Sequence, residues 1–227
     1  MKETFTSNVE GLVAQSPTIS QPELRLGVAE LLSSGVDSRE SLVQTLESGD
    51  TSDSATLAGC WLLGRLGYKD APGVLSTYLA DEDPKLCWEA AKSLVLIGDP
   101  QTLPLLKEML IGGEISHSRA AAAYVLGMMK CREAVSLLLD VLTSQDEPEV
   151  RSHAAEALGY IADRGATQIL ITALDDSSAE VRRWSIFALG EIGDNLAKPK
   201  LEEIVSSANS GQDLMRDEAI EALSKMK

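Results

Sequence analysis

The chain has 227 residues and a formal net charge of -15 at pH 7, from 35 acidic and 20 basic residues. This charge repels a polyanionic backbone, so nucleic acid is not a predicted partner. Hydrophobic residues make up 44% of the chain but aromatic residues only 4%. The core must therefore be built from Leu, Ala, Val and Ile, which favours close-packed helices over a sandwich or barrel.

A leucine recurs along the chain at intervals of 31 to 34 residues, and each time it lies in a stretch of small residues. The residue four positions earlier is small in every repeat, and the residue three positions later is apolar in all but the first, which is the spacing of an amphipathic helix. We call these stretches the leucine helices. Units of this length must stack to bury their apolar faces. The seven leucines are Leu31, Leu63, Leu94, Leu126, Leu158, Leu189 and Leu223.

Glycine follows most of the leucine helices and is expected to end them in a left-handed conformation. The glycines concerned are Gly35, Gly67, Gly98 and Gly193. The fourth and fifth repeats carry Lys130 and Ala162 at this place. These two turns are predicted to close differently, or with some strain.

A second helix is predicted after each of the five central leucine helices, and each pair forms a hairpin. Acidic turns, two of them followed by Pro84 and Pro148, separate the hairpins and supply helix caps. Pro104 and Pro199 are interpreted as late helix starts or kinks. No strand-like alternation of useful length occurs. The predicted second helices span residues 70–80, 100–111, 132–143, 165–174 and 195–206.

Two segments carry the clearest form of the repeat, Glu149-Val150-Arg151 with Ala157-Leu158-Gly159, and Glu180-Val181-Arg182 with Ala188-Leu189-Gly190. In these residues the chain resembles HEAT-repeat proteins of the short-repeat subclass named after phycobilisome lyases. The resemblance runs from about Gln21 to the C-terminus and implies an all-α, right-handed solenoid of about seven helical hairpins. It does not fix a function, because this subclass contains lyases, hydroxylases and adaptors.

One elongated domain is expected, with residues 1–20 as an N-terminal capping segment and residues 21–227 as the solenoid. The chain has no apolar run of 18 residues and no leader, so neither membrane insertion nor export is predicted and the protein is expected in the cytoplasm. The repeat units are assigned to residues 21–50, 51–82, 83–113, 114–145, 146–176, 177–210 and 211–227, the last of them partial.

Three cysteines lie in three different repeats, at Cys60, Cys87 and Cys131. Their spacing supports neither a disulfide framework nor a zinc site. A reduced thiol in the core is therefore the interpretation for Cys60.

The helical pitch predicts one exposed stripe along the second helices, rich in carboxylates and free of Lys and Arg. Second helices are expected to line the concave face of such a solenoid, so the stripe predicts an acidic groove. A groove of this kind suits a basic or amphipathic segment of another protein, although a solvated face of an acidic protein has the same pattern. The candidate groove residues are Asp70, Thr77, Gln101, Glu108, Glu133, Ser136, Leu139, Asp140, Gln168, Ile171, Thr172 and Glu203.

An arginine begins four successive leucine helices, at Arg119, Arg151, Arg182 and Arg216. We interpret this column as a structural ladder that links neighbouring repeats, with Asp163 as the partner of Arg182 and Asp194 as the partner of Arg216. Phosphate recognition is the alternative.

Aromatic residues share a second column of the leucine helices, at Trp61, Tyr124 and Phe187, with Trp88 and Trp184 near its edge. Packing at the outer hairpin surface is the expected role. If these side chains are exposed together, they indicate an interface instead.

Catalytic sites known on similar repeats have no match here. Deoxyhypusine hydroxylases hold their metal with His-Glu pairs after the arginine column, whereas this chain has Ser152-His153 and Arg183-Trp184 at such places. With two histidines in the whole chain, no metal centre and no cofactor are predicted. Whether the protein is an enzyme remains open, because a phycobilin lyase or isomerase subunit that handles a tetrapyrrole and its acceptor protein is the second hypothesis. The first is a non-catalytic scaffold that binds another protein in the acidic groove.

Overall fold

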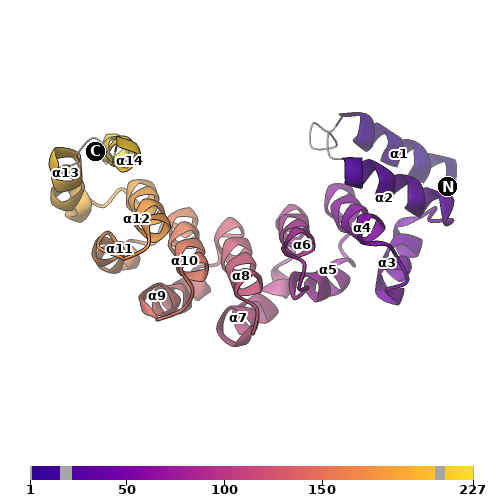
Figure 1. The fold of residues 1–227 in the computed structure, drawn as a ribbon, viewed down its shortest axis with the longest axis horizontal. Helices are drawn as coiled ribbons and strands as arrows, with labels where there is room; N and C mark the ends of the chain where they lie inside the picture. Colours follow the sequence, from indigo (N-terminus) through magenta and orange to yellow (C-terminus); the bar gives the residue numbers. More distant parts are fainter. Residues whose placement is uncertain (1, 16–21, 208–212, 227) are drawn as a thin grey trace. The chain divides into compact units, whose positions relative to one another are not determined.

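The computed structural model describes residues 2–15, 22–207 and 213–226 (Figure 1). All regular structure in these ranges is helical, as the sequence predicts. The chain forms two compact units, Met1–Thr102 and Leu103–Lys227.

The N-terminal unit contains three leucine helices, α2, α4 and α6, and the second helices of the first two, α3 and α5. Its first helix lies in the segment predicted to cap the solenoid, and it buries Phe5 and Val9. Ile19, which belongs to the same predicted cap, lies outside the described residues. The elements are α1 (Lys2–Gln15), α2 (Pro22–Ser33), α3 (Arg39–Ser48), α4 (Asp53–Leu66), α5 (Pro72–Leu79), α6 (Pro84–Ile97) and the 3₁₀ helix η2 (Pro100–Thr102).

The C-terminal unit contains four leucine helices, α8, α10, α12 and α14. Their bounds are Ser116–Met128, Pro148–Ile161, Ala179–Ile192 and Asp213–Lys225. The α-helical parts of its second helices are α7 (Leu103–Gly112), α9 (Val135–Thr143), α11 (Thr167–Ala173) and α13 (Lys198–Ser207).

Short 3₁₀ turns precede α9, α11 and α13, which the sequence pattern does not predict. They are η3 (Arg132–Ala134), η4 (Arg164–Ala166) and η5 (Asn195–Ala197). The aspartate before η4 or η5 accepts a hydrogen bond from the backbone two residues later, 2.8 Å from Gly165 N to Asp163 and 3.1 Å from Leu196 N to Asp194. This local bond favours a tight turn before the α-helix begins. Pro199 is the second residue of α13 and so marks a late start, not a kink.

Left-handed residues end the leucine helices even where glycine is missing. The predicted glycines all have positive φ, as does Gly49. Lys130 and Ala162 adopt the same conformation, with φ of 53° and 56°. These two turns therefore close in the same way as the others and carry the strain of a side chain in the left-handed region.

Neighbouring leucine helices approach one another closely because small residues face each other between them. A Cβ atom on Gly127 would lie 2.5 Å from the Cα atom of Ala157, and one on Gly159 would lie 2.9 Å from the Cα atom of Ala188. The second helices lack this pattern and stand farther apart. When the helices of one row are closer together than those of the other row, the stack curves so that the closely spaced row lies on the inside.

This geometry corrects the predicted position of the acidic stripe. In the C-terminal unit, α8, α10, α12 and α14 follow the inside of the curve, and α7, α9, α11 and α13 follow the outside (Figure 1). We call these the inner row and the outer row. The prediction that the second helices line the concave face is wrong for this unit, because the glycine and alanine contacts bring the leucine helices together.

Candidate functional site

The acidic stripe is exposed, but it lies on the outer row. Its carboxylates in the C-terminal unit are Glu108, Glu133, Asp140 and Glu203, and all four are exposed. Glu203 is ion-paired with Lys200, 3.4 Å away, and Lys200 also lies 3.2 Å from Asp175. The stripe is therefore partly neutralised. Its uncharged polar members, Ser136, Gln168 and Thr172, are exposed as well.

The other predicted groove residues are either half-buried or lie in the N-terminal unit. Leu139 and Ile171 are half-buried, so their apolar area belongs mostly to the core. Asp70, Thr77 and Gln101 are exposed in the N-terminal unit, and Gln101 lies in η2 instead of a second α-helix.

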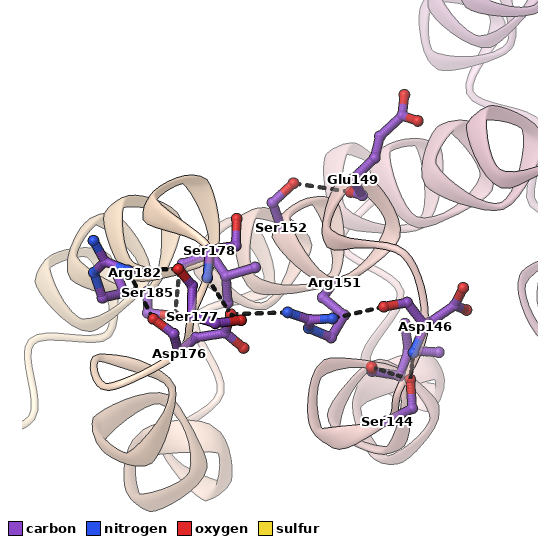
Figure 2. A network of polar contacts seen from close by, with 12 residues as sticks. Ser144, Asp146, Glu149, Arg151, Ser152, Asp176, Ser177, Ser178, Arg182 and Ser185 are labelled. Carbon is purple, nitrogen blue, oxygen red and sulfur yellow. Dashed lines mark hydrogen bonds and ion pairs between the residues drawn. The ribbon is translucent and has the colours of Figure 1, made fainter.

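The predicted arginine ladder is formed in part, by Arg119 and Arg151, and Figure 2 shows the contacts of Arg151. Arg119 pairs with the carboxylate of Asp146, and Arg151 Nη2 lies 2.8 Å from Asp176 Oδ1. Each arginine thus binds an acid in the turn before the next leucine helix. Arg182 donates instead to the backbone carbonyl of Asp176, at 2.7 Å.

The partners predicted for Arg182 and Arg216 are wrong. Asp163 and Asp194 cap the 3₁₀ turns, and Asp194 also accepts a hydrogen bond from Thr167 at 3.2 Å. Arg216 is exposed. Among the described residues, Arg119 and Arg151 are the members of the column that pair with an acid of the next hairpin.

Aromatic side chains cluster on the inner row, where the sequence led us to expect packing at the outer hairpin surface. Phe187 contacts Tyr160 and Trp184 edge-to-face, with ring centroids 5.5 Å and 5.4 Å apart. All three are only half-buried. α10 packs against α8, α9 and α12, and α12 packs against α10, α11 and α14. The half-buried cluster therefore lies on the remaining face of these two helices, toward the inside of the curve. We call Tyr160, Trp184 and Phe187 the inner aromatic cluster.

A buried carboxylate lies beside this cluster on α10. Glu156 is 5% exposed, and its Oε2 lies 2.7 Å from His153 Nδ1. Burial, the charge of Glu156 and a hydrogen bond to it raise the pKa of Tyr160. Burial and the same charge raise the pKa of Tyr124 on α8. Two protonated tyrosines and a histidine thus surround one carboxylate.

A small pocket opens between α12 and α14 next to the inner aromatic cluster. Its volume is about 190 Å³. Trp184 and Phe187 form its apolar wall, and Arg183, Glu218, Glu221 and Lys225 are its charged lining residues. Arg183 Nη2 lies 2.7 Å from Glu218 Oε1, and Lys225 Nζ lies 2.9 Å from Glu191 Oε1. We call this the Trp184 pocket.

The sequence pointed to Trp184 and Phe187 but not to Tyr160, Glu156 or the Trp184 pocket, because the wrong row was taken as concave. The glycine directly after the leucine was the available signal, at Gly127, Gly159 and Gly190. Each lies against an alanine of the next leucine helix. Only a close-packed, and hence inner, row needs this pattern. Of the other predicted aromatic residues, Trp61 is buried and Trp88 is half-buried.

The described residues hold no cluster of three or more His, Cys, Asp or Glu side chains arranged to bind a metal ion. The three cysteines are buried and form no disulfide with one another. Burial raises the pKa of the Cys60 thiol above its usual range, so this thiol stays protonated and is a poor nucleophile.

A family model of HEAT repeats matches residues 39–127, 114–183 and 135–224. The chain belongs to the HEAT-repeat family. This match confirms the resemblance seen in the sequence and the all-α repeat fold.

Solved structures of repeat proteins share this fold at low identity. The complex of CpcE and CpcF of phycocyanin lyase from Nostoc sp. PCC7120 aligns with a TM-score of 0.60 and 20% identity, covering 68% of this chain and 98% of that chain. A designed armadillo repeat protein in complex with the peptide (KR)4 aligns with a TM-score of 0.57 and 21% identity, covering 82% of this chain and 98% of that chain. These likenesses show the fold.

One relative by sequence is deoxyhypusine hydroxylase from Bos taurus, 47% identical over 60 residues. The match covers 26% of this chain and only 20% of the relative. Ser152-His153 and Arg183-Trp184, which stand where deoxyhypusine hydroxylases have His-Glu pairs, lie on α10 and α12 of the inner row. No helix among the described residues has the length and apolarity to span a membrane.

Proposed function

We propose that this HEAT-repeat protein is a non-catalytic scaffold that binds a segment of a partner protein along the inner row of its C-terminal unit. The observation that carries the proposal is the inner aromatic cluster. Half-exposed aromatic side chains beside charged groups are the residue types that dominate binding energy at protein interfaces. The cluster is held by edge-to-face contacts on two packed helices, so little order is lost when a partner binds.

The charge around the cluster supports a basic or amphipathic partner segment, the same kind of partner that was predicted from the acidic stripe. Glu149, Glu180 and Glu191 are exposed on the leucine helices of this unit, although Glu180 pairs with Arg183 and Glu191 with Lys225. Together with the net charge of -15, they attract cationic partners and speed their association. The (KR)4 peptide that is bound to the designed armadillo protein is a suitable first probe for the inner row.

The two rows can be compared directly by affinity capture from the native host, with identification by mass spectrometry. The inner-row variant is Tyr160→Ala with Trp184→Ala. The outer-row variant is Glu108→Lys with Asp140→Lys, and circular dichroism checks that both fold.

We expect one partner to be captured by the native protein and by the outer-row variant. The inner-row variant should not capture this partner. The captured partner, once purified, should bind the native protein with the same preference. Loss by the outer-row variant alone would assign the interface to the acidic stripe and overturn the proposal.

A phycobilin lyase-type role is the second hypothesis, and it predicts a different readout. Phycocyanobilin mixed with the purified protein should then gain visible absorbance that the inner-row variant lacks. The scaffold proposal expects the spectrum of the free pigment in both samples. Cytoplasmic location remains a prediction from the sequence.

A further inference from the structure

The Trp184 pocket contains a carboxylate that the protein itself uses only in part. Both hydrogen bonds that the Arg183 guanidinium donates to Glu218 go to the same atom, with Nε and Nη2 lying 2.9 Å and 2.7 Å from Glu218 Oε1. Glu218 Oε2 is buried and has no hydrogen-bond partner. A buried carboxylate oxygen without a donor is unfavourable. The Glu218 side chain lines the pocket and is 25% exposed, so its carboxylate can accept a further hydrogen bond from another molecule.

The charges at the pocket favour a cation as that donor. Arg183 contacts Glu180 and Glu218, and Lys225 contacts Glu191 and Glu221. These contacts raise the pKa of both bases, so each remains charged and paired. The charges that line the pocket balance, with Arg183 and Lys225 against Glu218 and Glu221. Glu180 and Glu191 do not line it but contact the same two bases, so the surroundings of the pocket carry a net negative charge. An anion entering here would have to displace existing ion pairs, whereas a cation would not.

The size of the pocket identifies the kind of cation. A volume of about 190 Å³ lies below the roughly 300–1,000 Å³ of pockets that hold drug-sized ligands. It corresponds to about six water molecules at about 30 Å³ each. This is room for one long side chain. The wall of Trp184 and Phe187 suits the apolar stem of such a side chain, and an indole ring attracts its charged end.

We propose that the Trp184 pocket binds one lysine or arginine side chain of the partner segment, whose charged end donates a hydrogen bond to the Glu218 carboxylate. This inference rests on the proposed function and adds the chemistry of one anchoring residue. The partner therefore places a basic residue opposite α12 and α14 while its neighbouring residues contact the inner aromatic cluster.

The test measures binding of fluorescein-labelled octapeptides by fluorescence polarisation. The probes are a peptide of alternating Lys and Arg, a Gln octapeptide and a Glu octapeptide. The native protein should bind the basic peptide most tightly. Glu218→Gln should weaken that binding about tenfold, because it removes a charge-assisted hydrogen bond. Trp184→Leu should weaken it about fivefold through the lost ring contact.

Glu108→Gln is the matched control, since it removes the same charge from an exposed position of the outer row. It should weaken binding less than about twofold. Equal losses in Glu218→Gln and Glu108→Gln would show attraction by net charge alone and overturn the inference. Tighter binding of the Glu octapeptide, abolished by Arg183→Gln, would show an anion pocket and overturn it as well.

The two proposals fail in different experiments. If no captured partner depends on Tyr160 and Trp184, the proposed function fails, whatever the peptides do. If such a partner is found but Glu218→Gln binds the basic peptide as Glu108→Gln does, only the assignment of the pocket fails.

Discussion

Gly127 on α8 lies against Ala157 on α10 so closely that a Cβ atom on Gly127 would stand 2.5 Å from the Cα atom of Ala157. Since the obstacle is backbone, a flexible side chain cannot move away to make room. Gly127→Ala is therefore expected to destabilise the protein by about 1–3 kcal/mol, measured as the free energy of unfolding in urea.

Gly73→Ala is the control for this substitution, because a Cβ atom on Gly73 in α5 would meet nothing within 4 Å. Alanine favours helix over glycine, so this variant should be unchanged or more stable by up to about 1 kcal/mol. A Gly127→Ala protein as stable as the native one would mean that α8 and α10 are not held at this spacing.

Ala162 is a position where a substitution to glycine should stabilise the protein, because it ends α10 with φ at 56°. An alanine in this conformation is strained by about 1–2 kcal/mol, and glycine is not. Part of the gain is offset by the greater freedom of glycine in the unfolded chain. Ala162→Gly should raise the free energy of unfolding by about 0.5–1 kcal/mol, measured by urea denaturation.

Lys130→Gly at the end of α8 should have the same effect, since Lys130 has φ at 53°. A glycine already stands at Gly193 after α12, and Gly193→Ala should lower the free energy of unfolding instead. If both substitutions to glycine destabilise the protein, the left-handed geometry of these turns is not the source of strain.

The repeat period, the helix class and the turn glycines were all predictable, because they depend on local spacing. The late start of α13 was also readable from Pro199. The curvature was not read correctly, although Gly127, Gly159 and Gly190 carried the signal, because it depends on which neighbour each helix meets. Contacts between hairpins, such as the pairing of Arg151 with Asp176, also depend on how neighbouring hairpins are placed, which the sequence pattern does not specify.

The candidate site was harder to predict than the fold. The aromatic column was visible in the sequence, but its exposure depends on the direction of curvature. The pairing of His153 with Glu156 is one helical turn apart and was open to prediction. Glu218 was not, because its role depends on the contact of α14 with Arg183 of α12, 35 residues away in the sequence.

The pair of Arg151 and Asp176 should make stability depend on pH. Burial acts to raise the pKa of Asp176, but hydrogen bonds from Arg151 and from the Ser178 backbone outweigh it and hold the pKa below its usual value. The folded pKa is thus below the unfolded value of about 3.9. The stabilisation is complete above that value and is lost as the pH falls through the folded pKa.

Asp176→Asn should therefore lower the free energy of unfolding by about 1 kcal/mol at pH 7, and the difference from the native protein should shrink below about pH 4. Urea unfolding at pH 7, 5 and 3 measures both effects. Asp175→Asn is the control, since the Asp175 side chain is 71% exposed and should contribute less than about 0.5 kcal/mol. A difference for Asp176→Asn that stays constant down to pH 3 would exclude the ion pair as its cause.

Glu156 makes the inner row sensitive to the loss of a single histidine. Its side chain is 6% exposed, and His153 Nδ1 lies 2.7 Å from its Oε2. His153→Ala removes this partner and leaves a carboxylate in a site with little access to water. The expected cost is about 1–3 kcal/mol in the free energy of unfolding.

A double-mutant cycle separates this coupling from the loss of packing. Glu156→Gln replaces the carboxylate by a neutral group of the same shape, so His153→Ala should cost less in that background, with a coupling energy of about 1 kcal/mol or more. Glu149→Ala, at an exposed position of the same helix, should change stability by less than about 0.5 kcal/mol. Additive costs in the cycle would show that His153 and Glu156 stabilise α10 independently, and the buried carboxylate would then need another source of compensation, such as the hydroxyl of Tyr160.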